Sequence, residues 1–528
     1  MQLSWEPILH AVPFPSNPYT VIASIEEGRF TFLNETKDLG EDIQWCPKNA
    51  GRLWIYNLHY FDYLQNLIEV NLEGAWQLLE RWIAHNPPGT SDAWDSYPLS
   101  LRIVNWIQAF SSSPIGLEVQ PVVMRSLYQQ CLWLERWLEW HLLANHLFKN
   151  AKALVFAGLF FSGGDAHRWL KSGLKILHEQ LEEQVLSDGG HFERSPMYHA
   201  MILKDCLDLF NGLKRPREGF DKEILASCIG LKEHLRRIVP EMGFFLAGMT
   251  HPDGKIALFN DAAHGIEPDF EHLEAYSQRV TGNALPKIPI GTTAFPDSGY
   301  FIMAKGSEDR LIVDAGPIGP DYQPGHSHCD TLSFELSLRG IRVVVDSGCY
   351  EYEDTPIRQY NRGNPGHNTV TVDGENQSEV WGSHRCARRA KPIYARMRSN
   401  GNKVLCFEGA HDGYRRLSGS PVHHRRVEWY PERIQIEDRV EGSGYHGIES
   451  RLHFNPSLDV DFDGKTATVT ANGQRLLSVS WLGEGCMEKI YGWYCPEFGM
   501  KFKCVVLCVT HRCDLPFRGS WILSLHSH

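Results

Sequence analysis

The sequence lacks the long apolar runs and the cysteine motifs that mark several large classes of protein. No window approaches the roughly 18 consecutive apolar residues of a transmembrane helix, so no membrane span is expected. The N-terminal residues show no basic stretch followed by an apolar run, so we expect no secretory signal. The 13 cysteines form no Cys-x-x-Cys pair, which favours reduced thiols in a cytoplasmic protein, although a trimmed periplasmic chain would look the same.

Acidic residues outnumber basic ones, 64 to 52, but one stretch of the chain is strongly basic. The formal net charge is −12, which argues against non-specific nucleic-acid binding. Residues 385–398 nevertheless carry six basic side chains, among them Arg385 and Arg388, and no acidic one. This local excess indicates an anionic ligand, small or polymeric, although any one of these arginines could equally lie on a solvated strand face.

Two patterns of apolar residues divide the 528-residue chain, which is too long for one compact core. From about residue 53 to 280 apolar residues recur at helical spacing between short turns, which predicts an α/α bundle or toroid. Beyond residue 290 the apolar runs are short and alternate with Asp-Gly and Asn-Gly turns, one of them at 400–401, which predicts an antiparallel β-sandwich or a large twisted sheet. We therefore predict an N-terminal extension in residues 1–50, a helical domain in 51–290 and a β domain in 291–528.

Histidine and aspartate cluster in three segments of the β domain. His326 and His328 lie two residues apart, so on a strand both rings would point to the same face. His328, Asp346 and His367 could close around one divalent metal, and zinc accepts such nitrogen and oxygen ligands. His326 would remain free beside the metal as an acid or base near neutral pH. The alternative is a hydrogen-bonded His/Asp network that holds no metal.

Polar residues also interrupt the helical domain. Asn145 and His146 stand in an otherwise apolar helical region, and such a pair is more often a cap or a satisfied core pair than a functional one. Tyr97 and Arg102 place an aromatic ring and a cation beside another predicted helix start, where the tyrosine could serve only for packing. Neither pair decides a function alone.

The segment 188–199 is the stronger polar cluster of the helical domain. It begins with a Gly-rich turn and continues with Ser195 and Pro196, the residue types preferred at the N-cap and at the first position of a helix. Tyr198 and His199 are therefore predicted in the first turn, where the positive end of the helix dipole lowers the cost of a phenolate.

Five motifs occur in an order that resembles the heparinase II/III-like polysaccharide lyases, to which alginate lyases are related. Over roughly residues 50–400 the chain contains Asn145-His146, Glu193–His199, Gly325–Asp330, Asp346–Tyr350 and His367–Gly374. The resemblance implies a fold in which an incomplete (α/α) toroid is followed by an antiparallel β-sandwich, in agreement with the two patterns of apolar residues.

The resemblance also implies β-elimination on a uronic acid within an acidic polysaccharide. Asn145 and His146 would neutralise the uronate carboxylate, so that the proton on C5 becomes removable. Tyr198 would act as the acid, and in syn elimination also as the base, whereas His326 would be the opposing base in anti elimination.

Further residues are implicated by the resemblance in metal or polymer binding. It implies a zinc ion, mainly structural, on the three metal ligands already named. The candidates for substrate binding are Tyr97, Arg102, His199, Tyr350, Arg358, Tyr360, Arg362, Arg385 and Arg388. A second catalytic tyrosine would be one of Tyr350, Tyr352 and Tyr360, and the sequence does not choose among them. Relatives of this type are often associated with the synthesis of bacterial surface polysaccharides.

Two other functions remain open from the sequence. Toroids of this kind also host inverting glycoside hydrolases, for which Asp95, Asp188, Glu193 or Asp261 could supply paired carboxylates. A non-catalytic factor that binds or assembles polysaccharide could retain the same fold, although the joint presence of the four implied catalytic residues favours an enzyme. No nucleic-acid partner is expected, and the oligomeric state, a dimer included, is left open.

Overall fold

The computed structural model describes residues 3–8, 10, 12–113, 119–214, 219–400 and 404–526, which form two compact units. The helical unit contains residues up to 185 together with 200–240 and 265–285. The sheet unit contains 186–199, 241–264 and the residues from 286 onward. The predicted change of pattern near residue 290 therefore lies close to a division of the fold. Gly401, half of the turn predicted at 400–401, lies outside the described residues.

Two segments that the sequence assigned to the helical domain belong instead to the sheet unit. His251 lies 2.7 Å from the Ser337 hydroxyl and 2.9 Å from the Glu335 carboxylate. The backbone amide of Asn260 donates to Oδ2 of Asp330 at 2.8 Å. Such contacts join residues far apart in sequence, which apolar periodicity does not report. The structure thus corrects the predicted helical domain of 51–290 at residues 186–199 and 241–264.

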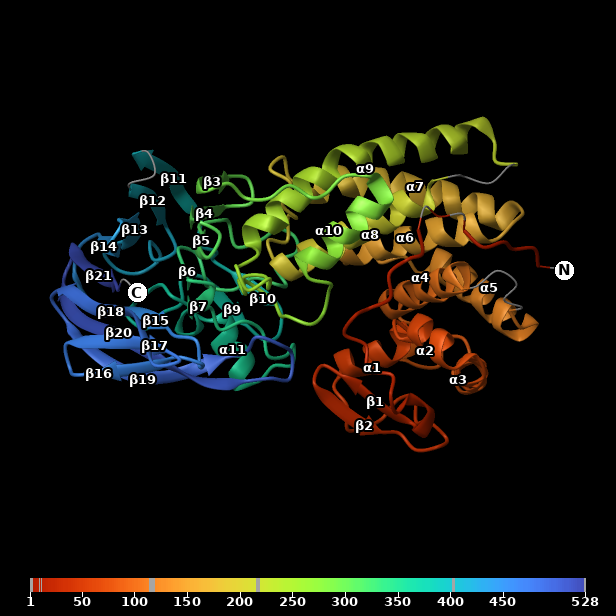
Figure 1. Cartoon of the computed structure of the whole chain (residues 1–528), viewed down its shortest axis with the longest axis horizontal. Helices are drawn as coiled ribbons and strands as arrows, with labels where there is room; N and C mark the ends of the chain where they lie inside the picture. Colours follow the sequence, from red (N-terminus) through yellow and green to blue (C-terminus); the bar gives the residue numbers. More distant parts are fainter. Residues whose placement is uncertain are drawn as a thin grey trace. The chain divides into compact units, whose positions relative to one another are not determined.

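The helical unit consists of successive helices joined by short turns (Figure 1). Its elements are η1 (Ile25–Glu27), β1 (Arg29–Phe32), β2 (Glu35–Asp38), α1 (Arg52–Tyr60), α2 (Leu64–Val70), α3 (Leu72–His85), η2 (Asp92–Trp94), α4 (Ser96–Ser112), α5 (Pro121–Arg136), α6 (Ala144–Phe160), α7 (Gly164–Gln184), α8 (Pro196–Gly212), α9 (Lys222–Met249) and α10 (Phe270–Thr281). The division between the units falls within α8 and after Pro240 of α9. Across the described ranges, no helix has both the length and the apolar character needed to cross a bilayer.

Helix α6 is almost entirely buried within the helical unit. Every residue of α6 except His146 is buried, which requires its charged side chains to find partners inside the protein. Lys149 and Lys152 do so by forming ion pairs at 2.7 Å with Asp205 and Asp208 of α8. The network compensates these buried charges, and His146 is the one residue of α6 that is not buried.

The sheet unit is built from antiparallel sheets (Figure 1). The five-stranded sheet has the order β3 (Gly291–Phe295), β4 (Tyr300–Lys305), β5 (Asp309–Asp314), β6 (Phe334–Leu338) and β7 (Ile341–Val344). The eight-stranded sheet has the order β11 (Pro392–Asn400), β12 (Val404–His411), β13 (Val422–Trp429), β14 (Arg433–Glu441), β21 (Phe517–Leu525), β18 (Gln474–Gly483), β17 (Thr466–Ala471) and β16 (Asp459–Phe462). The four-stranded sheet has the order β19 (Cys486–Tyr494), β20 (Phe502–Asp514), β15 (Tyr445–His453) and β8 (Val370–Val372). The remaining elements are the hairpin of β9 (Glu379–Trp381) and β10 (Arg385–Ala387), with α11 (Pro356–Arg362) and η3 (Asn364–Gly366).

One hydrophobic core joins the three larger sheets. It contains Phe334 of the five-stranded sheet, Trp429 and Trp521 of the eight-stranded sheet and Leu507 of the four-stranded sheet, all fully buried. Strands of the eight-stranded sheet such as β14 alternate buried and more exposed residues, whereas β6 of the five-stranded sheet is buried along its whole length. The fold class predicted from the sequence, a helical region followed by an antiparallel β region, is confirmed.

The segment that carries His326 and His328 is a loop. Strand β5 ends at Asp314 and β6 begins at Phe334, and the backbone between them is irregular. The prediction that strand alternation directs both rings to one face is therefore wrong. The two rings are brought together by a shared carboxylate, which belongs to a segment far away in sequence.

Candidate active site

That shared carboxylate is Asp261, which lies in a buried irregular segment after the end of α9 at Met249. Its Oδ2 atom accepts a hydrogen bond from Nδ1 of His326 at 3.0 Å, and its Oδ1 atom accepts one from Nε2 of His328 at 2.8 Å. The guanidinium of Arg358 on α11 donates to both oxygens, at 2.9 Å for Nη2 and Oδ2. One carboxylate thus sets the orientation of two imidazoles and is itself held by a fork of N–H donors.

The charge on Asp261 determines which nitrogen of His326 can act as a base. Although burial raises the pKa of a carboxyl group, the Arg358 guanidinium and the two imidazoles hold the pKa of Asp261 well below its usual range. An ionised carboxylate only accepts hydrogen bonds, so Nδ1 of His326 carries the proton and Nε2 is the basic nitrogen. Nε2 lies 3.4 Å from Oε2 of Glu193, whose charge stabilises an imidazolium once Nε2 takes up a proton.

Tyr198 stacks directly on His326. The two ring centroids are 4.0 Å apart with an angle of 30° between the planes, and the Tyr198 hydroxyl lies 3.0 Å from that of Tyr352. Tyr198 is in the first turn of α8, as predicted, and its backbone amide approaches the Ser195 hydroxyl at 3.4 Å. Burial raises the pKa of Tyr198 well above its ordinary value, so the phenol keeps its proton at neutral pH. Of the three candidate second tyrosines, the structure brings Tyr352 to this centre.

A second group of side chains beside Asp261 fits a metal ion. A ring nitrogen of His328, one of His367 and a carboxylate oxygen of Asp330 all lie within 4.8 Å of one another. Nδ1 of His328 and Nε2 of His367 are buried and have no hydrogen-bond partner in the described ranges. A divalent metal such as zinc would take these two nitrogens and the carboxylate as ligands, and it would give both buried nitrogens a partner.

Asp346, the predicted third ligand, lies on the other side of His367. Its Oδ2 atom is 2.8 Å from Nδ1 of His367, so it orients the ring from the nitrogen opposite the unpaired one. Burial raises the pKa of Asp346 to about 6, against the opposing effect of His367. The structure therefore favours Asp330 as the third ligand and gives Asp346 an orienting position.

The predicted pair on α6 forms a separate polar site in the helical unit. Nδ1 of His146 lies 3.0 Å from Oε1 of Glu139, and the amide of Asn150 donates to Oε2 of the same carboxylate at 2.9 Å. The ring of Tyr97 lies 4.5 Å from that of His146, at an angle of 44°. Asn145 is buried next to this partly exposed imidazole. Glu139 thus holds His146 in place much as Asp261 holds His326.

Two predicted substrate-binding residues of the helical segments belong to the protein interior. Arg102 is fully buried, stacks on Trp82 at 4.2 Å and donates to Gln130 at 2.8 Å, and burial lowers its pKa to about 9. His199 is buried, lies 2.9 Å from the carbonyl oxygen of Met242, and burial lowers its pKa to about 3. Because both side chains are buried inside their units, the structure corrects the prediction that they contact substrate.

Two predicted arginines of the β domain also have internal roles. Arg358 is fully buried against Asp261, as described above. Arg362 is fully buried and donates to the backbone carbonyls of Ser327 at 3.2 Å and of Gly382 at 3.1 Å. These arginines position the loop of His326 and do not reach a surface where a polymer could bind, which corrects the prediction for both.

The remaining predicted substrate-binding residues lie nearer to the surface. Arg385 is exposed, and Arg388 is exposed with one ion pair of 3.3 Å to Glu379. The Tyr360 hydroxyl is 3.2 Å from Nε2 of His453, which makes a packing role the better interpretation for this ring. Tyr350 is partly exposed, and Nζ of Lys501 lies 5.2 Å from its centroid.

Asp261 and Glu139 were missed as positioning residues. The sequence shows Asp261 as one acid in a buried run 65 residues before His326, and no spacing rule connects the two. Glu139 precedes His146 by seven residues across a turn, so helical periodicity does not connect them either. A buried acid next to asparagine in an apolar segment is the only signal the chain offered for Asp261.

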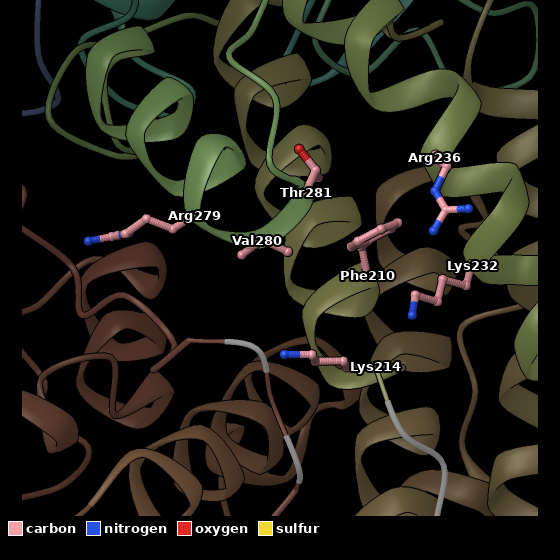
Figure 2. Close-up of a pocket in the computed structure, with 7 residues that line it drawn as sticks. All are labelled: Phe210, Lys214, Lys232, Arg236, Arg279, Val280 and Thr281. Atoms are coloured by element: carbon pink, nitrogen blue, oxygen red, sulfur yellow. The ribbon is translucent and has the colours of Figure 1, made fainter.

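The helical unit also has a basic pocket outside the predicted motifs. Its volume is about 250 Å³, and its lining includes Lys214, Lys232, Arg236, Arg279 and the ring of Phe210 (Figure 2). Lys232 and Arg236 lie 5.4 and 5.8 Å from that ring. Arg279 is in the last turn of α10, where a cation stabilises the helix dipole, and Arg236 is paired with Glu233 at 2.7 Å. The helix dipole and the ion pair with Glu233 therefore explain Arg279 and Arg236, two of the four cations, and no ligand is needed to explain them.

Comparison with known sequence families places the chain. The profile described as Heparinase II/III N-terminus matches residues 31–277, and the profile described as Heparinase II/III-like, C-terminal matches residues 288–520. The chain belongs to the heparinase II/III-like family. The gap between the two matches falls where this heparinase II/III-like chain passes from its helical to its sheet segments.

Individual relatives agree with this assignment. A heparin-sulfate lyase of Bacteroides thetaiotaomicron is 24% identical over 491 residues, which are 79% of this chain and 63% of the relative. FtsZ-localized protein C of Caulobacter vibrioides is 27% identical over 413 residues, 75% of this chain and 66% of the relative. The crystal structure of a heparinase III covers 92% of this chain and 80% of its own, with a TM-score of 0.73 and 18% identity, which is a likeness of fold. The chain spans 36 to 63% of the lengths of the heparin-sulfate lyases it matches.

Proposed function

We propose that this heparinase II/III-like protein is a polysaccharide lyase that cleaves a uronic-acid-containing polysaccharide by β-elimination. The observation that carries the proposal is the stack of Tyr198 on His326, with Asp261 leaving Nε2 of His326 as a base and burial keeping Tyr198 protonated. A base and an acid in contact are what removal of a proton and protonation of a leaving oxygen require.

The proposed reaction assigns one bond change to each group. Nε2 of His326 takes the proton from C5, and the electrons of that bond form the C4–C5 double bond as the bond from C4 to O4 breaks. Tyr198 gives its proton to O4, and its hydrogen bond to Tyr352 supports the phenolate that results. Asn145 and His146 bind the uronate carboxylate and stabilise the charge that develops when the proton leaves.

Acidic polysaccharide is the proposed substrate class, and nucleic acid is not a proposed partner. The matched relatives named heparin-sulfate lyase support this class, and the exposed Arg385 and Arg388 supply cations for an anionic chain. A role in the synthesis of a bacterial surface polysaccharide, rather than in its use as a nutrient, is part of the same proposal, as is a cytoplasmic location.

Zinc is the proposed metal, held by His328, Asp330 and His367 as a structural brace for the His326 loop. The unpaired nitrogens of the two histidines support it. Replacing His367 with Ala should lower both the bound zinc and the melting temperature, because metal binding contributes to folding. The zinc content of the purified protein is measured by metal analysis. Absence of zinc from the protein without substitutions would refute the proposed structural zinc.

A non-catalytic assembly factor with the lyase fold is the second candidate. It is favoured by the match to FtsZ-localized protein C, whose name describes a cellular location rather than an activity. The two candidates differ in whether the chain makes an unsaturated product.

Ultraviolet absorbance of the C4–C5 double bond tests the proposal directly. The purified chain is incubated with heparan sulfate, hyaluronan, alginate and bacterial capsular polymers, and Tyr198→Phe is the matched variant because it removes one oxygen. We expect a rise with at least one polymer that falls by about 10²- to 10⁴-fold in the variant. Full activity in Tyr198→Phe would overturn the assignment of Tyr198 as the acid. If the unchanged chain produced no rise in absorbance with any polymer, the assembly factor would be favoured.

A further inference from the structure

The inner face of the four-stranded sheet continues past the hydrophobic core. Along the antiparallel pair of β19 and β20, Met487 is opposite Val509, Tyr491 is opposite Val505, and Trp493 is opposite Lys503. Residues opposite one another, and residues two apart on one strand, share a face of the sheet. Met487 and Val509 are buried in the core, so Tyr491, Trp493 and Lys503 lie on the continuation of that same face.

This continuation is uncovered. Tyr491 is 57% exposed and Trp493 is 38% exposed, and Lys503 is also exposed. Large aromatic rings on the core side of a sheet are ordinarily covered by the facing layer, and an exposed group of them marks a binding surface. The rings are supported from below by regular strand pairing, so they form a rigid platform rather than a mobile loop.

Two lysines accompany the rings. Nζ of Lys503 lies 3.9 Å from the centroid of Tyr491, and Nζ of Lys501 lies 5.3 Å from that of Trp493 and 5.2 Å from that of Tyr350. Among the residues that the structure describes, neither lysine forms an ion pair with a carboxylate. Tyr350, Lys501, Trp493, Lys503 and Tyr491 therefore form a continuous aromatic–lysine track with two uncompensated positive charges.

One end of the track adjoins the proposed reacting centre within the sheet unit. Tyr350 is two residues from Tyr352, whose hydroxyl contacts that of Tyr198 at 3.0 Å. The ring of Tyr352 packs on Phe498 at 5.0 Å, and the amide of Gly499 donates to the carbonyl of Tyr350 at 2.9 Å. These contacts fix the start of the track relative to Tyr198 and His326.

We propose that the aromatic–lysine track binds the acidic polysaccharide beyond the sugar that reacts. The faces of sugar rings stack on Trp493 and Tyr491, because a sugar presents C–H groups to the negative face of an aromatic ring. Lys501 and Lys503 pair with the carboxylate or sulfate groups of the same chain, which selects acidic over neutral polymer. This inference rests on the proposed lyase function and names where its substrate is held.

Affinity electrophoresis of the full chain through gels that contain heparan sulfate, alginate or neutral dextran tests the track. Trp493→Ala with Tyr491→Ala removes the platform, and Lys501→Gln with Lys503→Gln removes the charge. Each pair of substitutions should raise the dissociation constant for an acidic polymer by about fivefold or more. Dextran should retard none of the proteins. Tyr445→Ala, an exposed ring on β15 of the same sheet, is the matched control and should bind as the unchanged chain does.

Three results would overturn the track: equal retardation of both double variants and the unchanged chain, equal loss in Tyr445→Ala, or no retardation by any acidic polymer. Loss of a dimer in the platform variant, with polymer binding intact, would assign the surface to a second copy of the chain instead.

Binding does not require cleavage, so the same gels run with Tyr198→Phe separate this proposal from the lyase proposal. A chain that binds through the track and makes no unsaturated product would refute the lyase and keep the track.

Discussion

The two units bury charge in different ways, and the difference separates a structural network from a functional one. In the helical unit, Lys152 is paired with both Asp205 and Asp208 at 2.7 Å, so each charge of this network has a partner of opposite sign. In the sheet unit, Asp261 is fully paired, but the network around it ends in ring nitrogens with no partner and in a stacked phenol and imidazole. A closed network stabilises a fold, whereas a network with open ends leaves groups available to a ligand or a proton.

Replacing Asp261 with Asn should have the largest effect of any change in either network. An amide cannot accept from both imidazoles and from Arg358, so His326 loses its orientation and a buried guanidinium loses its partner. We expect elimination to fall about 10³-fold and the free energy of unfolding to fall by about 3–5 kcal/mol. Steady-state kinetics and urea unfolding measure the two effects.

Asp438 supplies the matched control for that experiment. It is a fully buried carboxylate in the same unit, paired with Arg425 at 2.7 Å and with His423 at 3.0 Å, and it is not part of the proposed active site. Asp438→Asn should lose similar stability and keep the turnover of its folded fraction. Equal losses of turnover in the two variants would show that Asp261 acts only through stability.

Replacing Lys152 with Met should break the closed network and destabilise the helical unit. Asp205 keeps Lys149 and Asp208 keeps Lys204, but each loses one partner while remaining buried. We expect the free energy of unfolding to fall by about 3 kcal/mol. Lys171→Met, which removes an exposed pair with Glu223, should change the free energy of unfolding by no more than about 1 kcal/mol. Similar values for the two variants would contradict the claim that burial decides the effect.

The pH dependence of unfolding should show a smaller effect of the same network. Burial alone raises the pKa of Asp208, but Lys152 and Lys204 outweigh it and hold that pKa below its usual range. A depressed pKa stabilises the fold above the unfolded value of about 3.9, and this stability is lost as pH falls through the folded value. Urea unfolding between about pH 7 and pH 3 should lose about 1 kcal/mol from this group, because the rest of its contribution is lost only below pH 3. Lys152→Met should flatten that part of the profile, and an unaltered slope would assign it to other carboxylates.

Part of the candidate site was predictable because its signals are local. Ser195 and Pro196 predict a helix start, and α8 begins at Pro196 with Tyr198 in its first turn. The segment of His326 was misassigned to a strand because alternating polar residues in a loop imitate strand periodicity. The buried positions of Arg102, Arg358 and Arg362 could not be predicted, because a basic residue in a sequence looks the same whether its partner is solvent, a ligand or a buried carboxylate.

By itself the sequence determined the order of a helical and an antiparallel β region and the start of α8. These properties depend on residues within a few positions of one another, and side-chain periodicity and capping report them. Only the tertiary structure decided that Asp261 holds His326, that Asp330 replaces Asp346 beside the unpaired imidazoles, and that Tyr352 is the second tyrosine. Each of these choices joins segments many residues apart, and their proximity results from packing two layers around one core, which no local pattern encodes.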